Sequence, residues 1–490
     1  MAPSYGPHKR YGWLAAFVVA TTTLLVACGG GGGPWTGEGG SAGGGGVQPG
    51  VPGGLDANAG DGVVSLGWAT PATGTGPFSY KITIAPTTAG ASITQNGTTA
   101  LIENLSNGTT YTFSVTASNT SGQGTSASVQ ARPASSSTSA YGNVTILGDN
   151  SSTGILDASP LRGGSTTTTW MAYSGASFYN LNGQLIQDVA ARLARSDDGG
   201  QTFTFIRELG TPQPATVTDS LGTVCGGGVC TGRWVYAAPW LVDDSSDPNA
   251  ARRFKLFAHK YFLYPQAPQP QQFQLGSIVL WTASAPDGAW SSEQSVLGWN
   301  FTPPELTATN NVNTLDPALA QCLTASEGTA SLHNGVLDFA FTCAFDTLNP
   351  LARKIVLLRS PDHAISFQFV STLLQPSDAA LIGAAYFADP ALLPSPSNAP
   401  VLIATPVTAS GQGVVTPAGC HVIPITDEQS GTLLRNAGNA PAAILTLPSP
   451  TNTLGGGCAW DRGITGTGIM MNSFVQTSGP FSILKTNRSL

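Results

Sequence analysis

A loose repeat in the last two thirds of the chain limits most strongly what this sequence can fold into. Five stretches carry an apolar strand near the middle of each unit: TWMAYSG, RFKLFAHKYF, GVLDFAFTC, APVLIATP and TGIMMNSF. Several units open on a segment that contains aspartate, such as ILDASPL, TLDPALAQ and FADPALL. A repeat of this size is typical of a β-propeller, in which each unit is one four-stranded blade. The length of 145–490 therefore predicts a five-bladed β-propeller.

The rest of the chain also predicts an all-β protein. Short β-branched and aromatic runs alternate with Gly, Pro, Asn and Asp, and long helical periodicity is missing. Charged residues make up only 10% of the 490 residues, and the net charge is −7. Nucleic-acid binding has little support, because that affinity comes mostly from Lys and Arg on phosphates. We expect a monomer that binds no nucleic acid.

The N-terminus has the layout of a targeting segment. The basic HKR precedes the apolar run WLAAFVVATTTLL, and LVAC ends it. Leu25-Val26-Ala27-Cys28 resembles the lipobox of bacterial lipoproteins. The resemblance implies a signal peptide over 1–28, lipid on Cys28 and a membrane anchor, and Gly29 favours the outer membrane over the inner one. An ordinary secretory signal that ends near a cysteine is the alternative.

Composition divides the segment between this signal and the repeat. Residues 29–54 are rich in glycine and predict a flexible tether. Residues 55–133 predict seven short strands, and 134–144 predict a second linker. Tyr111 follows Leu105 by six residues, the position of a tyrosine corner in an immunoglobulin-like sandwich. The pattern resembles a fibronectin type III domain, which implies a spacer or adhesion module with these core residues: Trp68, Tyr80, Leu105 and Tyr111.

Six cysteines remain after Cys28. An even number in an exported protein predicts disulfides. CGGGVC forms a plausible small loop, Cys322 and Cys343 flank one expected hairpin, and the last two cysteines are left for each other. A zinc site is the alternative, but none of the six cysteines has a neighbouring Cys or His at the spacing typical of zinc ligands. The expected pairs are Cys225–Cys230, Cys322–Cys343 and Cys420–Cys458.

The stretch SDDGGQTF, residues 196–203, predicts a tight hairpin turn. Aspartate caps free backbone N–H groups, and glycine supplies positive φ. SPDHAISF, residues 360–367, repeats the pattern with Ala364 in place of a glycine. Both resemble the Asp box of sialidases and related propellers. The resemblance implies that Asp198 has a structural role and takes no part in a reaction.

Two acids at unit openings are the candidate catalytic residues. Asp157 in ILDASPL and Glu327 in SEGTASLHNGVLDFAFTC resemble the acids of the five-bladed glycosidases of families 43 and 32. The resemblance implies that Asp157 activates water as a general base and Glu327 protonates the leaving oxygen. Inverting chemistry needs about 6.5–9.5 Å between the two carboxyls. Ala238 stands where the family places a third carboxylate in blade two, and Thr329 stands where proline is usual.

Two further groups have competing interpretations. Trp234 and Trp240 lie near a unit opening and are candidate sugar-stacking residues, although packing between blades explains them equally well. The cluster DDSSDP, residues 243–248, offers oxygens for calcium, but it lacks the spacing of a known calcium loop, and a solvated loop is the favoured interpretation. No other cofactor is expected.

The leading functional hypothesis is glycoside hydrolysis at the cell envelope. A non-catalytic propeller that binds glycans or proteins at the cell surface is the rival, favoured by the missing acid at Ala238. An exo-sialidase is a third hypothesis. It needs three arginines around the substrate carboxylate, and Arg162, Arg233 and Arg359 are scattered candidates.

Overall fold

The computed structural model describes most of the chain after the tether. The described residues are 46–490 without 136–140, 166, 182, 223, 265–273, 334, 347–348, 350, 394–399, 410–414, 462–463, 465, 476–478, 487 and 489–490. The expected signal peptide, the lipobox with Cys28 and most of the tether lie outside them. In the described part of the chain, no helix is long and apolar enough to cross a bilayer.

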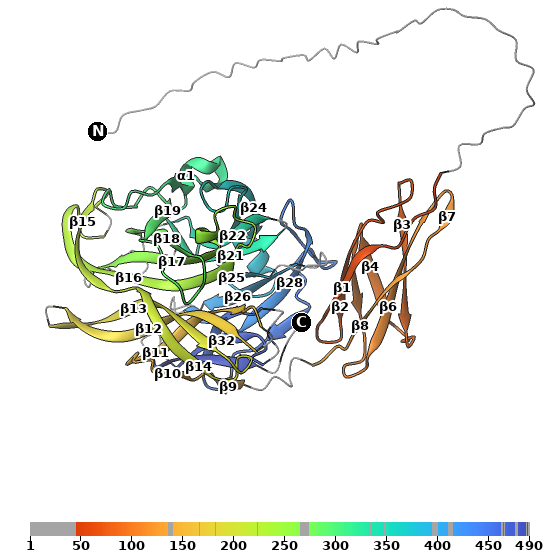
Figure 1. The fold of residues 1–490 in the computed structure, drawn as a ribbon, viewed down its shortest axis with the longest axis horizontal. Coiled ribbons are helices and arrows are strands. Elements are labelled where there is room, and N and C mark those ends of the chain that lie inside the picture. Colours follow the sequence, from red (N-terminus) through yellow and green to blue (C-terminus); the bar gives the residue numbers. More distant parts are fainter. Residues whose placement is uncertain are drawn as a thin grey trace, which may run out of the picture. The chain divides into compact units, whose positions relative to one another are not determined.

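The first described region is a sandwich of two antiparallel sheets (Figure 1). One sheet has the order β1-β2-β5-β4, and the other has β3-β6-β7 with β8 also paired to β6. β1 begins at Gly53, inside the segment expected to be tether. The strands are β1 (Gly53–Ala59), β2 (Val64–Ala69), β3 (Ser79–Ala85), β4 (Ser92–Asn96), β5 (Thr99–Glu103), β6 (Tyr111–Asn119), β7 (Gly122–Gln123) and β8 (Ala127–Ala131).

The core of this sandwich contains the four residues expected there. Trp68, Leu105 and Tyr111 are buried, and Tyr80 packs against them while partly exposed. The backbone N–H of Ser106 donates to the Tyr111 hydroxyl at 3.0 Å. This bond ties the strand to the loop five residues upstream, which is the tyrosine corner that the spacing predicts.

The second region is a series of groups of β-strands that follow one another along the chain, and the first and last groups belong to one sheet (Figure 1). The first contains β11 (Gly154–Arg162), β12 (Thr169–Leu181), β13 (Gln184–Ser196) and β14 (Phe203–Gly210). The second contains β15 (Gln213–Asp219), β16 (Gly228–Asp243), β17 (Phe254–Leu263), β18 (Gly276–Ala283), β19 (Gln294–Gly298) and β20 (Asn310–Asn311). The third contains β21 (Thr324–His333), β22 (Val336–Ala344), β23 (Arg353–Ser360) and β24 (Gln368–Leu374).

Two more groups of strands complete the series. The fourth contains β25 (Tyr386–Leu393), β26 (Val401–Ala409), β27 (Val415–Pro417), β28 (Cys420–Asp427), β29 (Thr432–Leu433) and β30 (Leu445–Leu447). The last contains β31 (Leu454–Ala459), β32 (Met470–Phe474) and β33 (Phe481–Thr486). The described α-helices are single turns, α1 (Val312–Leu315) and α2 (Pro376–Ala380).

One strand of each group carries the same irregularity. We call β11, β16, β21, β25 and β31 the leading strands. In each, pairing with the next strand is interrupted at a bulge, where one residue has a φ between 47° and 57°. This left-handed conformation is uncommon outside glycine. We call these positions the bulge residues: Asp157, Ala238, Glu327, Asp389 and Gly457.

The bulges are joined to one another through the neighbouring strands. The residue before each bulge pairs with a polar residue on the adjacent strand: Ser174, His259, Thr342, Thr405 or Asn472. Three of these accept a hydrogen bond from the bulge amide of the following group. Asp157 donates to Asn472 at 2.7 Å, Ala238 donates to Ser174 at 3.1 Å, and Gly457 donates to Thr405 at 2.8 Å. The first group is thereby bonded to the last.

Apolar cores fill the spaces between successive groups. The core that joins the first group to the second contains Trp170 and Trp234, and the next contains Phe257 and Phe339. Two further cores join the third group to the fourth and the fourth to the last. The last group also packs against the first, because Ile483 shares a core with Met171, Tyr173 and Ala194 of β12 and β13. Packing therefore continues from the end of this region back to its beginning.

Strand pairing closes the same junction. β9 (Tyr141–Asn143) is antiparallel to β33, and β10 (Ile146–Leu147) is parallel to β14. The expectation of a linker over 134–144 is therefore corrected, because its last residues form a strand. β9 has only three residues and its partner lies more than three hundred positions away, so no local periodicity could reveal it.

The two predicted turns have matching hydrogen bonds. The Asp198 carboxylate accepts from the amides of Gln201 and Thr202 and from the Thr202 hydroxyl. The Asp362 carboxylate accepts from the amide and hydroxyl of Ser366 in the same way. Each turn lies between the third and fourth strands of its sheet. Asp198 thus stabilises its own turn, as expected.

Candidate functional site

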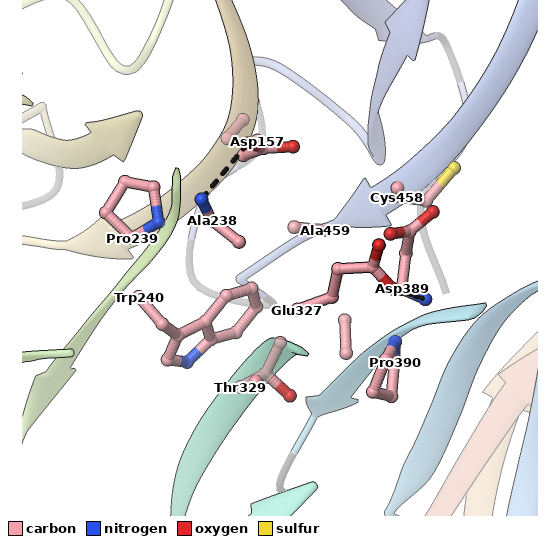
Figure 2. A pocket seen from close by; sticks show the side chains of 14 residues that line it. Asp157, Ala238, Pro239, Trp240, Glu327, Thr329, Asp389, Pro390, Cys458 and Ala459 are labelled. Carbon is pink, nitrogen blue, oxygen red and sulfur yellow. Dashed lines mark hydrogen bonds between the residues drawn. The ribbon is translucent and has the colours of Figure 1, made fainter. Parts of the chain in front are cut away.

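The bulge residues surround a small pocket. The pocket has a volume of about 40 Å³ and is lined by all five of them (Figure 2). It adjoins a cavity of about 190 Å³ with which it shares Asp157, Ala238, Glu327 and Asp389. We call the two together the acid pocket, because three carboxyl groups from three sheets line both. All three residues are partly exposed.

Asp157 is held by donors from three different groups of strands. Its carboxylate accepts from the Ser174 hydroxyl at 2.7 Å, the Ala238 amide at 3.1 Å and the Asn472 side-chain amide at 3.0 Å. Burial raises the pKa of Asp157 above its ordinary value, against these hydrogen bonds, which favour the ionised form. The three donors fix the orientation of a carboxylate that burial has made more basic.

Glu327 and Asp389 lie together on another side of the pocket. Figure 2 shows their carboxyl groups close to one another. The Asp389 amide also donates to Glu327 Oε2 at 3.4 Å. Burial raises the pKa of Asp389 well above its ordinary value, and the charges of Glu327 and Asp157 add to the effect. A carboxyl whose protonated form is favoured therefore lies in the same pocket as Asp157.

The wall of the larger cavity carries further polar groups. Tyr261 and His259 come from β17, and Arg353 begins β23. Burial lowers the pKa of His259 to about 3, so its imidazole is neutral at neutral pH. Burial raises the pKa of Tyr261, and the charge of Asp157 adds to this. Arg353 partly opposes the rise in the pKa of Asp389. The cavity combines donors, acceptors and one cation, a set that suits a polyhydroxylated ligand.

The structure separates the two tryptophans expected to bind sugar. Trp240 lines the small pocket, and its indole N–H donates to the Ala330 carbonyl. Trp234 lies in the core between the first two groups, 7% exposed, with its ring edge-on to Phe262. We therefore drop Trp234 as a substrate residue, because its ring is covered by neighbouring side chains. Regular alternation would put the two rings on one face of β16, six residues apart, but the bulge between Ala237 and Trp240 shifts the register by one residue.

The three arginines considered for sialidase chemistry do not lie together in one pocket. Arg233 pairs with Asp188 at 2.8 Å, and Arg359 pairs with Asp338 at 2.7 Å. Arg162 lines a different cavity of about 360 Å³, which also contains Trp460. None of the three is among the residues that line the acid pocket in the described part of the chain. The exo-sialidase hypothesis loses its structural basis.

The aspartates considered for calcium have a protein cation between them. Lys255 Nζ lies 2.9 Å from Asp244 and 2.8 Å from Asp247, and all three side chains are buried. His363 Nδ1 also contacts Asp244 at 2.9 Å. The ammonium group supplies the positive charge that a calcium ion would bring. We therefore assign this cluster a structural role.

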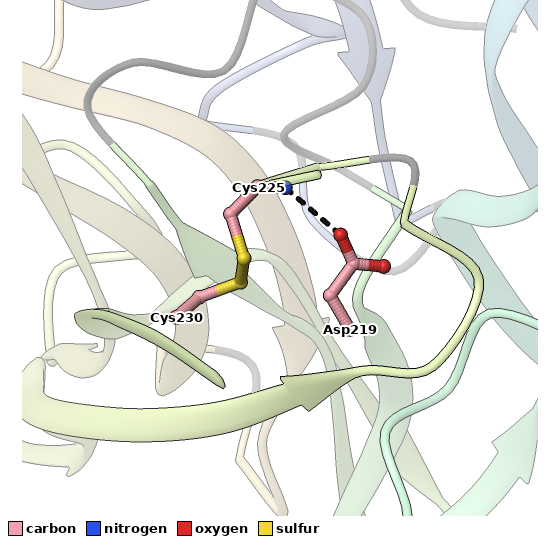
Figure 3. Close-up of side chains that lie close together, drawn as sticks. All are labelled: Asp219, Cys225 and Cys230. Carbon is pink, nitrogen blue, oxygen red and sulfur yellow. Dashed lines mark hydrogen bonds between the residues drawn. A yellow bond between two sulfur atoms is a disulfide. The ribbon is translucent and has the colours of Figure 1, made fainter. Parts of the chain in front are cut away.

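The three disulfides are those expected. The bonds join Cys225 to Cys230, Cys322 to Cys343 and Cys420 to Cys458. The first lies beside Asp219, whose carboxylate accepts from the Cys225 amide at 2.8 Å (Figure 3). The last joins β28 to the leading strand β31, and Cys458 lines the acid pocket next to Gly457. It thus fixes one side of the pocket covalently.

Asp389 is the site residue that the sequence argument missed. FADPALL opens a unit, but only the first and third openings resemble the acid motifs of the glycosidases. Aligning the openings on the bulge gives LDA, AAP, SEG, ADP and GGC around it, which places Asp389 in register with Asp157 and Glu327. That alignment was the available signal.

Comparison with known proteins gives distant structural likenesses and one domain match. A family 117 glycoside hydrolase from the marine bacterium Zobellia galactanivorans is 12% identical, with 72% of this chain and 91% of that one covered and a TM-score of 0.41. An exo-1,5-α-L-arabinanase from a bovine ruminal metagenomic library is 12% identical, with 68% and 92% covered and a TM-score of 0.39.

At these identities and TM-scores, the likenesses do not show what the second region does. No curated protein matches the chain. The sequence model of the fibronectin type III domain matches residues 50–132. The first region is therefore a fibronectin type III domain.

Proposed function

We propose that the second region is a five-bladed β-propeller that hydrolyses glycosidic bonds. The observation that carries the proposal is the meeting of Asp157, Glu327 and Asp389 in one pocket from three separate groups of strands. Glycoside hydrolysis uses two carboxyls on either side of the scissile bond, one ionised and one protonated. Asp157, with its three hydrogen bonds, and Glu327 in the same pocket are the candidates for these roles.

The blade count rests on the leading strands. Five bulges with one geometry, cores between successive groups and pairing between the last group and the first all support a ring of five. In a propeller, the innermost strands surround a central channel. The bulge residues would then face one another across that channel, which is where a substrate would bind.

In the proposed reaction, Asp157 takes a proton from water as the water oxygen bonds to the anomeric carbon. The glycosidic C–O bond breaks, and Glu327 gives its proton to the leaving oxygen. Water and the glycoside become a free sugar, which is a hemiacetal, and an alcohol, so atoms and charge balance. A water between base and sugar gives inversion at the anomeric carbon. Trp240 adds an apolar side chain to the lining of the pocket.

We also propose that lipid on Cys28 anchors the chain to the bacterial cell envelope, with the glycine-rich segment as a tether. The lipobox-like sequence supports this placement. Mass spectrometry of the mature protein tests it. Diacylglycerol on an N-terminal Cys28 is the expected result, and a mature chain that begins elsewhere without lipid would contradict it.

The test of the hydrolase is a screen of aryl glycosides and arabinoxylan with the wild-type protein, Asp157→Asn and Glu327→Gln. We expect both substitutions to lower kcat/KM by about a hundredfold or more, since each removes a proton-transfer group. Asp287→Asn, an exposed acid outside the pocket, is the control. Proton NMR of the first product should show inversion.

Two results would overturn this assignment. Activity that is unchanged in both acid variants removes the pocket from the mechanism. Glycan binding by calorimetry without turnover by the wild-type protein supports the rival hypothesis of a non-catalytic surface propeller.

A further inference from the structure

We infer that the tip of the β12–β13 hairpin is a distal binding site for a neutral polysaccharide, the end of which enters the acid pocket. The inference rests on the proposed function for the role of the pocket, and it adds the class of substrate, a polymer without charged groups. Two exposed aromatic side chains and two exposed side-chain amides form the site. We call these four residues the tip platform: Phe178, Tyr179, Asn180 and Gln184.

The hairpin extends past the leading strand beside it. β11 begins at Gly154, which pairs with Ala176, whereas β12 continues to Leu181. Figure 1 shows the hairpin projecting from the second region. The acid pocket lies toward the same end of the sheet, because Leu156 and Asp157, near the start of β11, line its larger cavity. The tip platform therefore projects beyond the end of the strand that carries the proposed base.

Tyr261 connects the hairpin to the cavity. It lines the cavity and shares an apolar cluster with Ile186, which is the cross-strand partner of Tyr179. Burial raises the pKa of Tyr261, and the charges of Asp157 in the pocket and Asp188 on the hairpin both add to this rise. One side chain thus lies near both the pocket and the hairpin.

The ring of Tyr179 is held from one side. The guanidinium carbon of Arg233 lies 3.7 Å from the centre of the ring, and two hydrogen bonds of 2.9 and 2.8 Å hold Arg233 to Asp188. Arg233 and Asp188 are buried, whereas Tyr179 is 37% exposed. An aromatic ring that is fixed before binding loses less conformational entropy when a ligand stacks on it. The exposed part of Tyr179 is therefore a preorganised surface for the C–H face of a sugar ring.

The charges of the platform and the pocket favour a neutral chain. Asp188 neutralises Arg233 beneath the platform. Asn180 and Gln184 carry uncharged amides, which can both donate to and accept from hydroxyl groups. In the described part of the chain, four carboxyl groups and one guanidinium group line the acid pocket. An acidic glycan would meet this excess of negative charge, whereas a neutral one would not.

The separation between the platform and the pocket favours a long substrate. Arg233, which stacks on Tyr179, lies four residues before Ala237 on β16, and Ala237 lines the larger cavity. At about 3.3 Å per residue, four residues of a strand span about 13 Å. A single sugar in the pocket does not cover this distance, but a chain of several units does. The platform therefore contributes to the binding of polymers more than to that of small glycosides.

The platform is tested first by binding. Affinity gel electrophoresis on arabinoxylan, arabinan and galactan uses Asp157→Asn as the parent, which prevents hydrolysis. We expect Tyr179→Ala in this parent to weaken binding of at least one polymer about tenfold, whereas Tyr179→Phe, which keeps the ring, should bind as the parent does. Ile365→Ala, which removes an exposed apolar side chain from the turn between β23 and β24, is the control.

Three results of the binding experiment would overturn the inference. A parent that binds none of the three polymers removes the polysaccharide. Equal binding by Tyr179→Ala and Tyr179→Phe removes the role of the ring. Tighter binding of polygalacturonate, an acidic polymer, than of the three neutral ones removes the preference for an uncharged chain.

Kinetics separate this inference from the proposed hydrolase. If the wild-type protein is active, Tyr179→Ala should raise KM for the bound polysaccharide about tenfold and change kcat/KM for an aryl monosaccharide far less. Equal losses on both substrates overturn the platform. An inactive wild-type protein whose polysaccharide binding depends on the ring of Tyr179 rejects the hydrolase and retains the platform.

Discussion

At the scale of single residues, the bulge residues contribute to the pocket in two ways, some through their side chains and one through its backbone amide. Asp157, Glu327 and Asp389 combine a carboxyl with a left-handed backbone, a conformation that costs on the order of 1–3 kcal/mol outside glycine. Ala238 has the same strained conformation and no functional side chain. The hydrogen bond from its backbone amide to the Asp157 carboxylate explains why the bulge occurs there. The strained backbone at Ala238 therefore helps to orient the Asp157 carboxylate.

Ser174 offers a direct test of how Asp157 is tuned. Its hydroxyl donates to the Asp157 carboxylate at 2.7 Å and lowers the pKa that burial raises. Ser174→Ala should raise this pKa further, so the base is protonated at a higher pH. The acidic limb of the kcat/KM profile should therefore move to higher pH. Ser177→Ala on the same strand is the control, and an unmoved acidic limb for Ser174→Ala would exclude this contribution.

Sequence reasoning located residues well where a repeat marked them. Asp157 and Glu327 were identified because each opens a unit, and the structure brings both to one pocket. Trp234 was misassigned, because strand periodicity does not say which face of β16 meets a core. Asp389 was missed because the expected third acid was sought on the second unit. The hydrogen bond between two acids sixty-two positions apart leaves no local signal.

At the scale of elements, turn chemistry and strand alternation were the most informative patterns. The aspartate turns and the tyrosine corner were predictable because each is stabilised by residues within a few positions of one another. The short strand β9 was not, since it depends on a partner at the far end of the chain. The bulges also could not be predicted, because a register break depends on the paired strand and on the residues beyond it.

The disulfides should differ in their effect on stability. The Cys225–Cys230 bond spans 5 positions and the Cys420–Cys458 bond spans 38. Loop-closure entropy assigns them about 2 and about 4 kcal/mol respectively. We expect the double alanine variant of Cys420 and Cys458 to lose more stability in urea unfolding than that of Cys225 and Cys230. The reverse order would mean that the entropy of the unfolded chain does not determine the difference in stability between the two variants.

At the scale of the whole molecule, the second region depends on the junction between its two ends. Ile483 on β33 is fully buried against β12 and β13. Ile483→Ala should lower the free energy of unfolding by about 2–5 kcal/mol. The matched control is Ile365→Ala, since Ile365 is 58% exposed. Differential scanning calorimetry should show a lower Tm for the second region only in the first variant. A similar Tm in both variants would contradict the importance of the junction.

The pairing of β9 with β33 has a consequence for biosynthesis. A ribosome releases Tyr141 more than three hundred residues before Thr486, so β9 has no partner during that interval. Until then, β9 and β11 expose unpaired edges that can join other chains. Translation that pauses or stops before β33 should therefore produce aggregates, and the nascent chain needs protection by chaperones until β33 emerges.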